Sequence, residues 1–228
     1  MKMIKATVLS LAVTGALAGG QAVAGVEANI GATSNYIWRG VSQSDDRAAV
    51  SGGLDWSNDS GFYLGTWASS LGGAHYEQDL NGDYVPRGAQ YELDLYGGFG
   101  GEIEGGFGYD VGVIAYLYPI GDVESDFTEV YLNGSYGMFN AGVAYTVDTE
   151  AGGSGDLYAS AGLDFDLGND MGLGLTFGSY SFDADSSADY THVNASISKG
   201  DFTFAIDKTD QDDAAGDPRV SVSWGATF

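Results

Sequence analysis

The sequence contains no cysteine, and this absence removes several kinds of chemistry at once. Disulfide bonds, thiolate metal sites and cysteine nucleophiles are all excluded. Proline is scarce at 3 residues, and Lys and Arg together number 8 against 32 Asp and Glu. The formal net charge of -24 argues against a nucleic acid as partner, because phosphate binding requires the opposite sign.

Long apolar runs are also missing beyond the N-terminus. Residues 1–24 have the features of a cleaved signal peptide, with Lys2 and Lys5 around the start of an apolar stretch at 4–18 and the small-residue cleavage site Ala22-Val23-Ala24. An uncleaved anchor is the alternative, but the stretch is too short to span a bilayer as a helix. Cleavage would leave residues 25–228 as one domain with a net charge of -26, since two lysines and no acid are lost from -24.

What the chain has in abundance is alternation of apolar and polar residues with a period of two. In residues 48–57, Val50, Leu54 and Trp56 share one face, and Asn58-Asp59-Ser60-Gly61 then supplies a tight turn. Such alternation predicts half-buried strands of the length that crosses a membrane, about 9–11 residues. The segments are 26–41, 48–57, 62–69, 89–99, 105–118, 127–136, 138–147, 157–165, 171–177, 192–198, 202–207 and 219–228.

The connections between these segments alternate in length. Short ones are expected at 58–61, 100–104, 137, 168–170 and 199–200. Longer, acidic ones are expected at 42–47, 71–88, 119–126, 148–155, 183–189 and 208–217. This layout is typical of an outer-membrane protein, so we predict an all-β fold, an antiparallel up-and-down transmembrane barrel of about 12 strands with both termini in the periplasm.

Aromatic residues concentrate at the ends of the outward faces, where amphipathic rings prefer the level of the lipid headgroups. At the short-turn end we expect Trp56, Phe62, Phe99, Phe107, Phe139, Phe165, Phe202, Trp224 and Phe228. At the long-loop end we expect Tyr36, Trp38, Tyr91, Tyr145 and Phe177. The terminal Phe228 resembles the signal that the barrel-insertion machinery recognises.

Several motifs carry a family resemblance. They are SNY at 34–36, WRGVSQS at 38–44, GGLD at 52–55, SGFYLGTWAS at 60–69, YELD at 91–94, YDVGV at 109–113, YLYP at 116–119 and EVY at 129–131. In these the chain resembles the TorF family of porin-like proteins, also described as the uncharacterised Gcw_chp family. The resemblance implies an outer-membrane barrel and a porin function, with no defined substrate or catalytic residue.

The inward faces carry most of the strand charges. The expected pore-lining residues are Arg39, Asp55, Glu92, Asp94, Asp110, Glu129, Asp164, His192, Asp207 and Arg219. An excess of carboxylates in a narrow pore favours cations over anions. The alternative is that these charges pair across a plugged lumen and serve folding only.

A catalytic role receives little support. His192, Asn194 and Ser196 share one strand face, but the parity of the strand directs them to the lumen and away from a lipid substrate. We therefore predict a monomeric outer-membrane channel of a Gram-negative bacterium for passive diffusion of small, preferably cationic or neutral solutes, with no catalytic residue, metal or cofactor. Its expected partners are the lipid bilayer, lipopolysaccharide, the insertion machinery and the solutes. The alternative is a non-conducting barrel whose outer loops act, and a barrel hydrolase is the third hypothesis.

Overall fold

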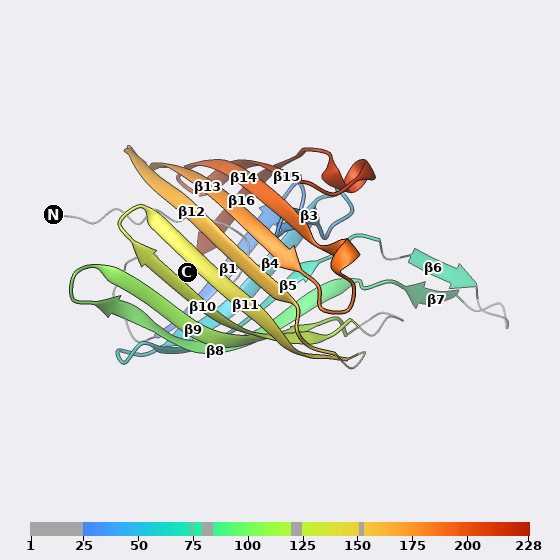
Figure 1. Ribbon diagram of the computed structural model, residues 1–228, viewed down its shortest axis with the longest axis horizontal. Helices are drawn as coiled ribbons and strands as arrows, with labels where there is room; N and C mark the ends of the chain where they lie inside the picture. The colour runs from blue at the N-terminus through green and yellow to red at the C-terminus, as the bar shows by residue number, and fades with distance from the viewer. Residues whose placement is uncertain (1–24, 74, 79–83, 120–124, 151–152) are drawn as a thin grey trace.

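A computed structural model describes residues 25–73, 75–78, 84–119, 125–150 and 153–228, so the signal peptide predicted over 1–24 lies outside the described residues. Twelve antiparallel strands form a closed barrel (Figure 1). They are β1 (Gly25–Thr33), β4 (Ala49–Ser57), β5 (Phe62–Ser70), β8 (Tyr91–Ile103), β9 (Phe107–Leu117), β10 (Phe127–Tyr136), β11 (Phe139–Thr149), β12 (Leu157–Gly168), β13 (Met171–Ser181), β14 (Tyr190–Lys199), β15 (Phe202–Thr209) and β16 (Arg219–Thr227). The predicted antiparallel barrel and its strand number are confirmed.

The barrel closes between the first and the last strand. β1 pairs with β4 along its whole length and with β16 from Asn29 to Thr33. Beyond the strand ladder, Ala28 and Phe228 exchange backbone hydrogen bonds of 3.2 and 2.8 Å. Closure leaves no strand of the barrel with an unpaired edge.

Short and long connections gather at opposite ends of the barrel (Figure 1). The short turns are residues 58–61, 104–106, 137–138, 169–170 and 200–201. The turn expected at 100–104 is shifted, because β8 continues to Ile103. Since β1 runs from the short-turn end to the long-loop end and β16 runs back, both strand termini lie at the short-turn end.

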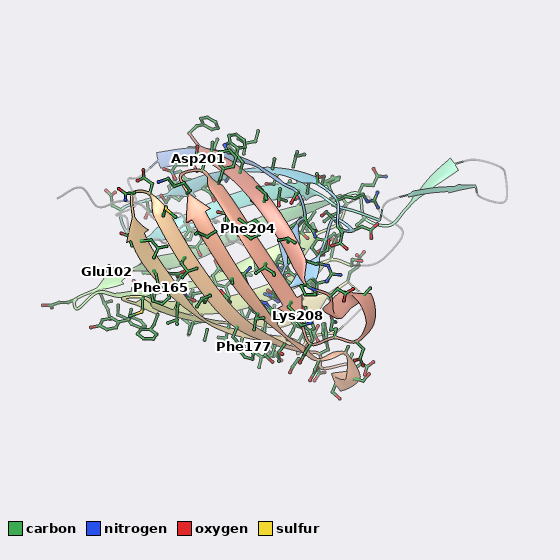
Figure 2. The ribbon with its side chains drawn as sticks, turned by 90° about the horizontal axis from the view of Figure 1, so that it is seen from above. Glu102, Phe165, Phe177, Asp201, Phe204 and Lys208 are labelled. Carbon is green, nitrogen blue, oxygen red and sulfur yellow. The ribbon has the colours of Figure 1, made fainter. Side chains whose placement is uncertain are left out.

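Polarity is inverted relative to a water-soluble domain. Outward side chains are apolar and exposed, as for Val50 at 65% and Phe204 at 49%, whereas inward Glu92 is 3% exposed. Figure 2 shows Phe165, Phe177 and Phe204 on the outer surface. The interior is therefore a layer of polar and aromatic side chains, and it contains the charged residues that the sequence placed there.

The long connections contain the remaining regular structure. β6 (His75–Gln78) and β7 (Tyr84–Arg87) form a hairpin that projects from the long-loop end (Figure 1). Two 3-10 turns, η2 (Ser186–Ala188) and η3 (Asp213–Gly216), follow in later loops. None of the helices among the described residues has the length and apolar character needed to cross a membrane.

Candidate functional site in the barrel interior

The first long connection, residues 34–48, folds into the barrel, and we call it the inner hairpin. It contains β2 (Ile37–Trp38) and β3 (Val41–Ser42), which pair across the two-residue tip Arg39-Gly40. Both tip residues have positive φ, 49° and 83°, as a type I′ hairpin turn requires.

The prediction of one strand over 26–41 is therefore wrong beyond Thr33. Side chains replace the ladder at this point: the Ser44 hydroxyl accepts from the Tyr36 backbone N–H at 2.8 Å, and the Thr33 hydroxyl donates to the Asn35 carbonyl at 2.8 Å. Such local side-chain bonds offer the backbone an alternative to the sheet. They redirect the chain inward after β1.

Tyr36 anchors the start of the inner hairpin to the wall. The Tyr36 hydroxyl donates to Glu92 Oε1 at 2.6 Å, and the Tyr36 ring meets the Trp67 ring edge-on with 5.5 Å between centroids. Tyr118 donates to the other carboxylate oxygen, Glu92 Oε2, at 2.9 Å. Burial, followed by the charge of Glu92, raises the pKa of Tyr36, so the hydroxyl remains a donor. With 2% exposure, Tyr36 is not at the membrane interface where the sequence placed it.

Arg39 anchors the tip. Its guanidinium donates two hydrogen bonds to Glu129 on β10, at 2.7 and 2.6 Å. The same group lies over the rings of Trp38, Tyr158 and Tyr180, at 4.1, 4.2 and 5.1 Å. The two side chains of the ion pair are only 9% and 1% exposed, so this pair is shielded from water.

Trp38 also belongs to this interior cluster. Its ring contacts Tyr116, Phe127 and Tyr180 at 5.7, 6.2 and 6.1 Å. Its predicted place on the outer surface is wrong, because the chain leaves the sheet after Thr33 and the parity of β1 no longer applies. Apart from Tyr36 and Trp38, the other twelve predicted interface aromatics lie on the barrel strands or, for Phe228, directly after β16.

A third contact fixes the base of the inner hairpin. Asp46 accepts from Asn35 Nδ2 at 2.7 Å and from Arg219 Nε on β16 at 3.0 Å. Gly40 touches the far wall so closely that a Cβ there would lie 2.6 Å from the Cβ of His192. The inner hairpin thus reaches across the lumen, and both predicted lumen cations, Arg39 and Arg219, form ion pairs with carboxylates.

Four aspartates on the barrel wall form a second arrangement, which we call the aspartate ring. Its members lie three strands apart around the twelve-stranded barrel, each between the third and sixth residue from the short-turn end of its strand. They are Asp55 on β4, Asp110 on β9, Asp164 on β12 and Asp207 on β15. Each accepts a hydrogen bond from an asparagine amide, at 3.1 Å from Asn29, 3.4 Å from Asn133, 2.7 Å from Asn140 and 2.9 Å from Asn194.

Neutral donors therefore orient these four carboxylates. Tyr96 donates to Asp55 at 2.5 Å and Tyr63 to Asp110 at 2.6 Å, and neither bond brings a positive charge. Sequence parity placed all four on the inner face, but the asparagine partners and the quarter-turn spacing depend on the register of the strands.

The remaining predicted residues, Asp94 and His192, are buried on the inner face. Asp94 is 2% exposed and its Oδ1 has no hydrogen-bond partner. His192 Nε2 lies 2.9 Å from the Tyr158 hydroxyl, and Asn194 binds Asp207. In the part of the chain that is described, no three His, Cys, Asp or Glu residues are grouped as a metal site would need.

Comparison with known proteins gives a family and a fold. No curated protein matches the sequence. The profile of the family described as "Bacterial protein of unknown function (Gcw_chp)" matches residues 17–216, whereas the TorF label remains a prediction.

Solved structures resemble the chain in fold. The KdgM porin aligns with a TM-score of 0.56 at 8% identity, covering 89% of this chain and 98% of that one. The "KdgM porin in complex with disordered oligogalacturonate" gives 0.54 at 7%, covering 89% and 97%. A NanC porin gives 0.43 at 9% identity, covering 89% and 98%.

Proposed function

The chain belongs to the Gcw_chp family of bacterial proteins of unknown function, and from its barrel and its interior we propose that it is an outer-membrane channel for small cationic or neutral solutes. The preference for cations is inferred from the described part of the interior, where more negative than positive side chains lack a partner of opposite charge. Both arginines on the inner side are neutralised by carboxylates, while the four members of the aspartate ring face only neutral donors.

Membrane insertion is supported by the outer surface. Its apolar side chains would be costly in water, and lipid replaces water around a closed barrel. Phe228, 77% exposed, ends the chain beside β1 and is available to the insertion machinery. We propose periplasmic termini, a monomer, and lipopolysaccharide around the acidic outer loops, after removal of residues 1–24.

Cation preference follows from the unneutralised acids of the interior. The four members of the aspartate ring make no ion pair with a described residue: Asp55, Asp110, Asp164 and Asp207. A narrow water column between low-dielectric walls strengthens their potential and concentrates positive solutes. Arg39 and Arg219 would favour anions only if their own carboxylate partners were removed.

The negative charge of the interior makes the ligand named for one structural relative an unsuitable solute for this barrel. Oligogalacturonate is a chain of sugar acids and is therefore polyanionic. An interior with uncompensated aspartates repels such a chain. We infer that this barrel shares the fold of the KdgM porin and differs in the charge of what passes.

Reversal potentials in planar bilayers test the charge preference. In a salt gradient the wild type should prefer cations, and Asp164→Asn with Asp55→Asn should lower the cation-to-anion permeability ratio. Asp59→Asn, on an exposed short turn, is the matched control and should leave the ratio unchanged, because exposed charges are screened within about 8–10 Å. A preference of the wild type for anions would refute the assignment of cation selectivity to the interior aspartates.

The inner hairpin favours a second candidate, a barrel that is filled and does not conduct. Tyr36, Trp38 and Arg39 occupy the long-loop half of the interior. If neither the wild type nor a variant with a released hairpin conducts, this second candidate replaces the channel. A catalytic role is not proposed, because the His192 imidazole is engaged by Tyr158 inside the barrel.

Orientation has its own test. Protease sites inserted in residues 71–88 or 208–217 should be cut on intact cells, whereas a site in residues 58–61 should be cut only after the outer membrane is permeabilised. The opposite pattern would reverse the proposed orientation and the location of the termini.

A further inference from the structure

The outer wall of the barrel has an apolar groove over β11 to β15, with a volume of about 660 Å³. Two rows of outward side chains in cross-strand register form it. The first row is Phe139, Leu163, Leu175, Ala195 and Ile206, and the second is Ala161, Phe177, Val193 and Lys208. We propose that this groove binds one acyl chain of an anionic membrane lipid, whose phosphate pairs with Lys208.

The dimensions of the groove fit a single acyl chain. It crosses five neighbouring strands, so four strand spacings make it roughly 19 Å long. Half of a hydrocarbon core of about 30 Å is about 15 Å, the depth that one leaflet's chains occupy. A chain from one leaflet can therefore lie along the groove over most of its length.

The shape of the groove distinguishes it from the surrounding wall. Large side chains border it, with Phe139 58% and Phe177 52% exposed, while Ala161 and Ala195 leave a hollow between them. A mobile lipid that only passes along the wall leaves the atoms lining the hollow without dispersion contacts. An acyl chain held in the hollow makes these contacts.

Lys208 supplies the headgroup contact. It is the seventh of the eight residues of β15, so it lies at the long-loop end and on the outer side of the barrel (Figure 2). Its ammonium donates to the Gly216 carbonyl at 2.8 Å, which leaves two further N–H donors. A cation beside an apolar groove at a membrane boundary matches the phosphate of a lipid rather than a neutral headgroup.

Acidic residues are close to this lysine and must be considered. Both carboxylate oxygens of Asp210 are held by the Thr191 backbone N–H and hydroxyl, at 2.6 and 2.8 Å. Asp212 and Asp217 are exposed in the same loop and could hold a phosphate only through divalent ions. The proposal assigns the phosphate to Lys208 directly, and this difference can be tested with a chelator.

The proposal rests on the membrane location given above, and photolabelling tests it separately. The full mature protein is inserted in phosphatidylcholine nanodiscs that contain a small fraction of phosphatidylglycerol with a diazirine in its acyl chain. After irradiation, adducts are mapped by mass spectrometry. The expected result is enrichment on β12 to β14 over the opposite wall, and about fivefold more labelling than with a phosphatidylcholine probe.

Matched variants give the design its controls. Ala195→Phe fills the groove and should abolish the enrichment, with Ala161→Leu as a second filling variant should the first fail to fold. Ala68→Phe, at an outward alanine on β5, five strands from both β12 and β14 around the barrel, should leave it intact. Lys208→Gln should remove the preference for phosphatidylglycerol and keep the acyl labelling.

Several outcomes overturn the proposal. Equal labelling around the whole barrel would mean that the groove contacts only annular lipid. Loss of the enrichment on addition of a chelator would mean that divalent ions, and not Lys208, bind the lipid phosphate. Cross-linking between two copies through β12 to β14 with little lipid labelling means that a second copy covers the groove. Failure to enter nanodiscs would refute the membrane location itself, whereas insertion and conductance with uniform labelling refute this inference alone.

Discussion

Arg39→Ala should release the inner hairpin from the barrel wall. The substitution leaves Glu129, 1% exposed, without its cation and also removes the three ring contacts of the guanidinium. Breaking a buried pair by deleting one partner costs about 3–5 kcal/mol. The equilibrium between docked and undocked hairpin should therefore shift by roughly two to four powers of ten toward the undocked form.

Two measurements follow that shift. Single-channel conductance should rise, because the hairpin crosses the interior from β1 to β10 and β14. Chymotrypsin should cut after Trp38, whose ring is covered in the wild type by Tyr116, Phe127 and Tyr180. Far-ultraviolet circular dichroism should remain that of a barrel, because the strand ladder is untouched.

The same connection provides the control. Arg47 pairs with Asp45 at 2.5 Å, but the two side chains are 63% and 65% exposed. Exposed pairs contribute about 0–1 kcal/mol, so Arg47→Ala should change neither conductance nor cleavage. If Arg39→Ala behaves as Arg47→Ala does, the ion pair between Arg39 and Glu129 does not hold the hairpin against the wall, and this explanation of its docking is refuted.

Two further variants test the remaining anchors. Gly40→Ala should also release the hairpin, because φ at this position is +83° and the new Cβ would overlap the side chain of His192. Gly137→Ala is the control for backbone strain alone, since Gly137 has a φ of +60° and open space around it. Equal conductance in the two variants would contradict the close contact between Gly40 and His192. Tyr36→Phe removes a hydrogen bond to the Glu92 carboxylate and should lower the free energy of unfolding by about 1.5–3 kcal/mol. The measurement is the temperature at which the folded barrel converts to the unfolded form on gels, which should fall. An unchanged temperature would mean that Glu92 does not depend on this donor.

The barrel could be predicted because its rules are local. Alternation with a period of two and turn residues at regular spacing fix which side chain points inward, so Asp55, Asp110, Asp164 and Asp207 were identified without knowledge of their neighbours. Turn boundaries were less reliable: glycines at 100 and 101 suggested a turn, yet Gly100 and Gly101 lie within β8.

The inner hairpin could not be predicted by the same rules. Residues 34–41 continue the alternation of β1, so parity extends the strand and places Tyr36 and Trp38 outside. Their actual positions depend on partners distant in the sequence, Glu92 and the aromatic cluster on β9, β10 and β13. A local signal was present, since Arg39-Gly40 is compatible with a two-residue turn, but alternation outweighed it.

The position of the inner hairpin directly after the first barrel strand has a consequence for assembly. Tyr36, Arg39 and Asp46 bind residues that follow them by 56, 90 and 173 positions. Contacts between residues so far apart form late, because the long loops that they close cost entropy before any contact is gained. The last of them, on β16, requires the same strand that closes the barrel on β1. Docking of the hairpin should therefore be completed together with closure, so that a partly inserted barrel still has a wide and unguarded interior.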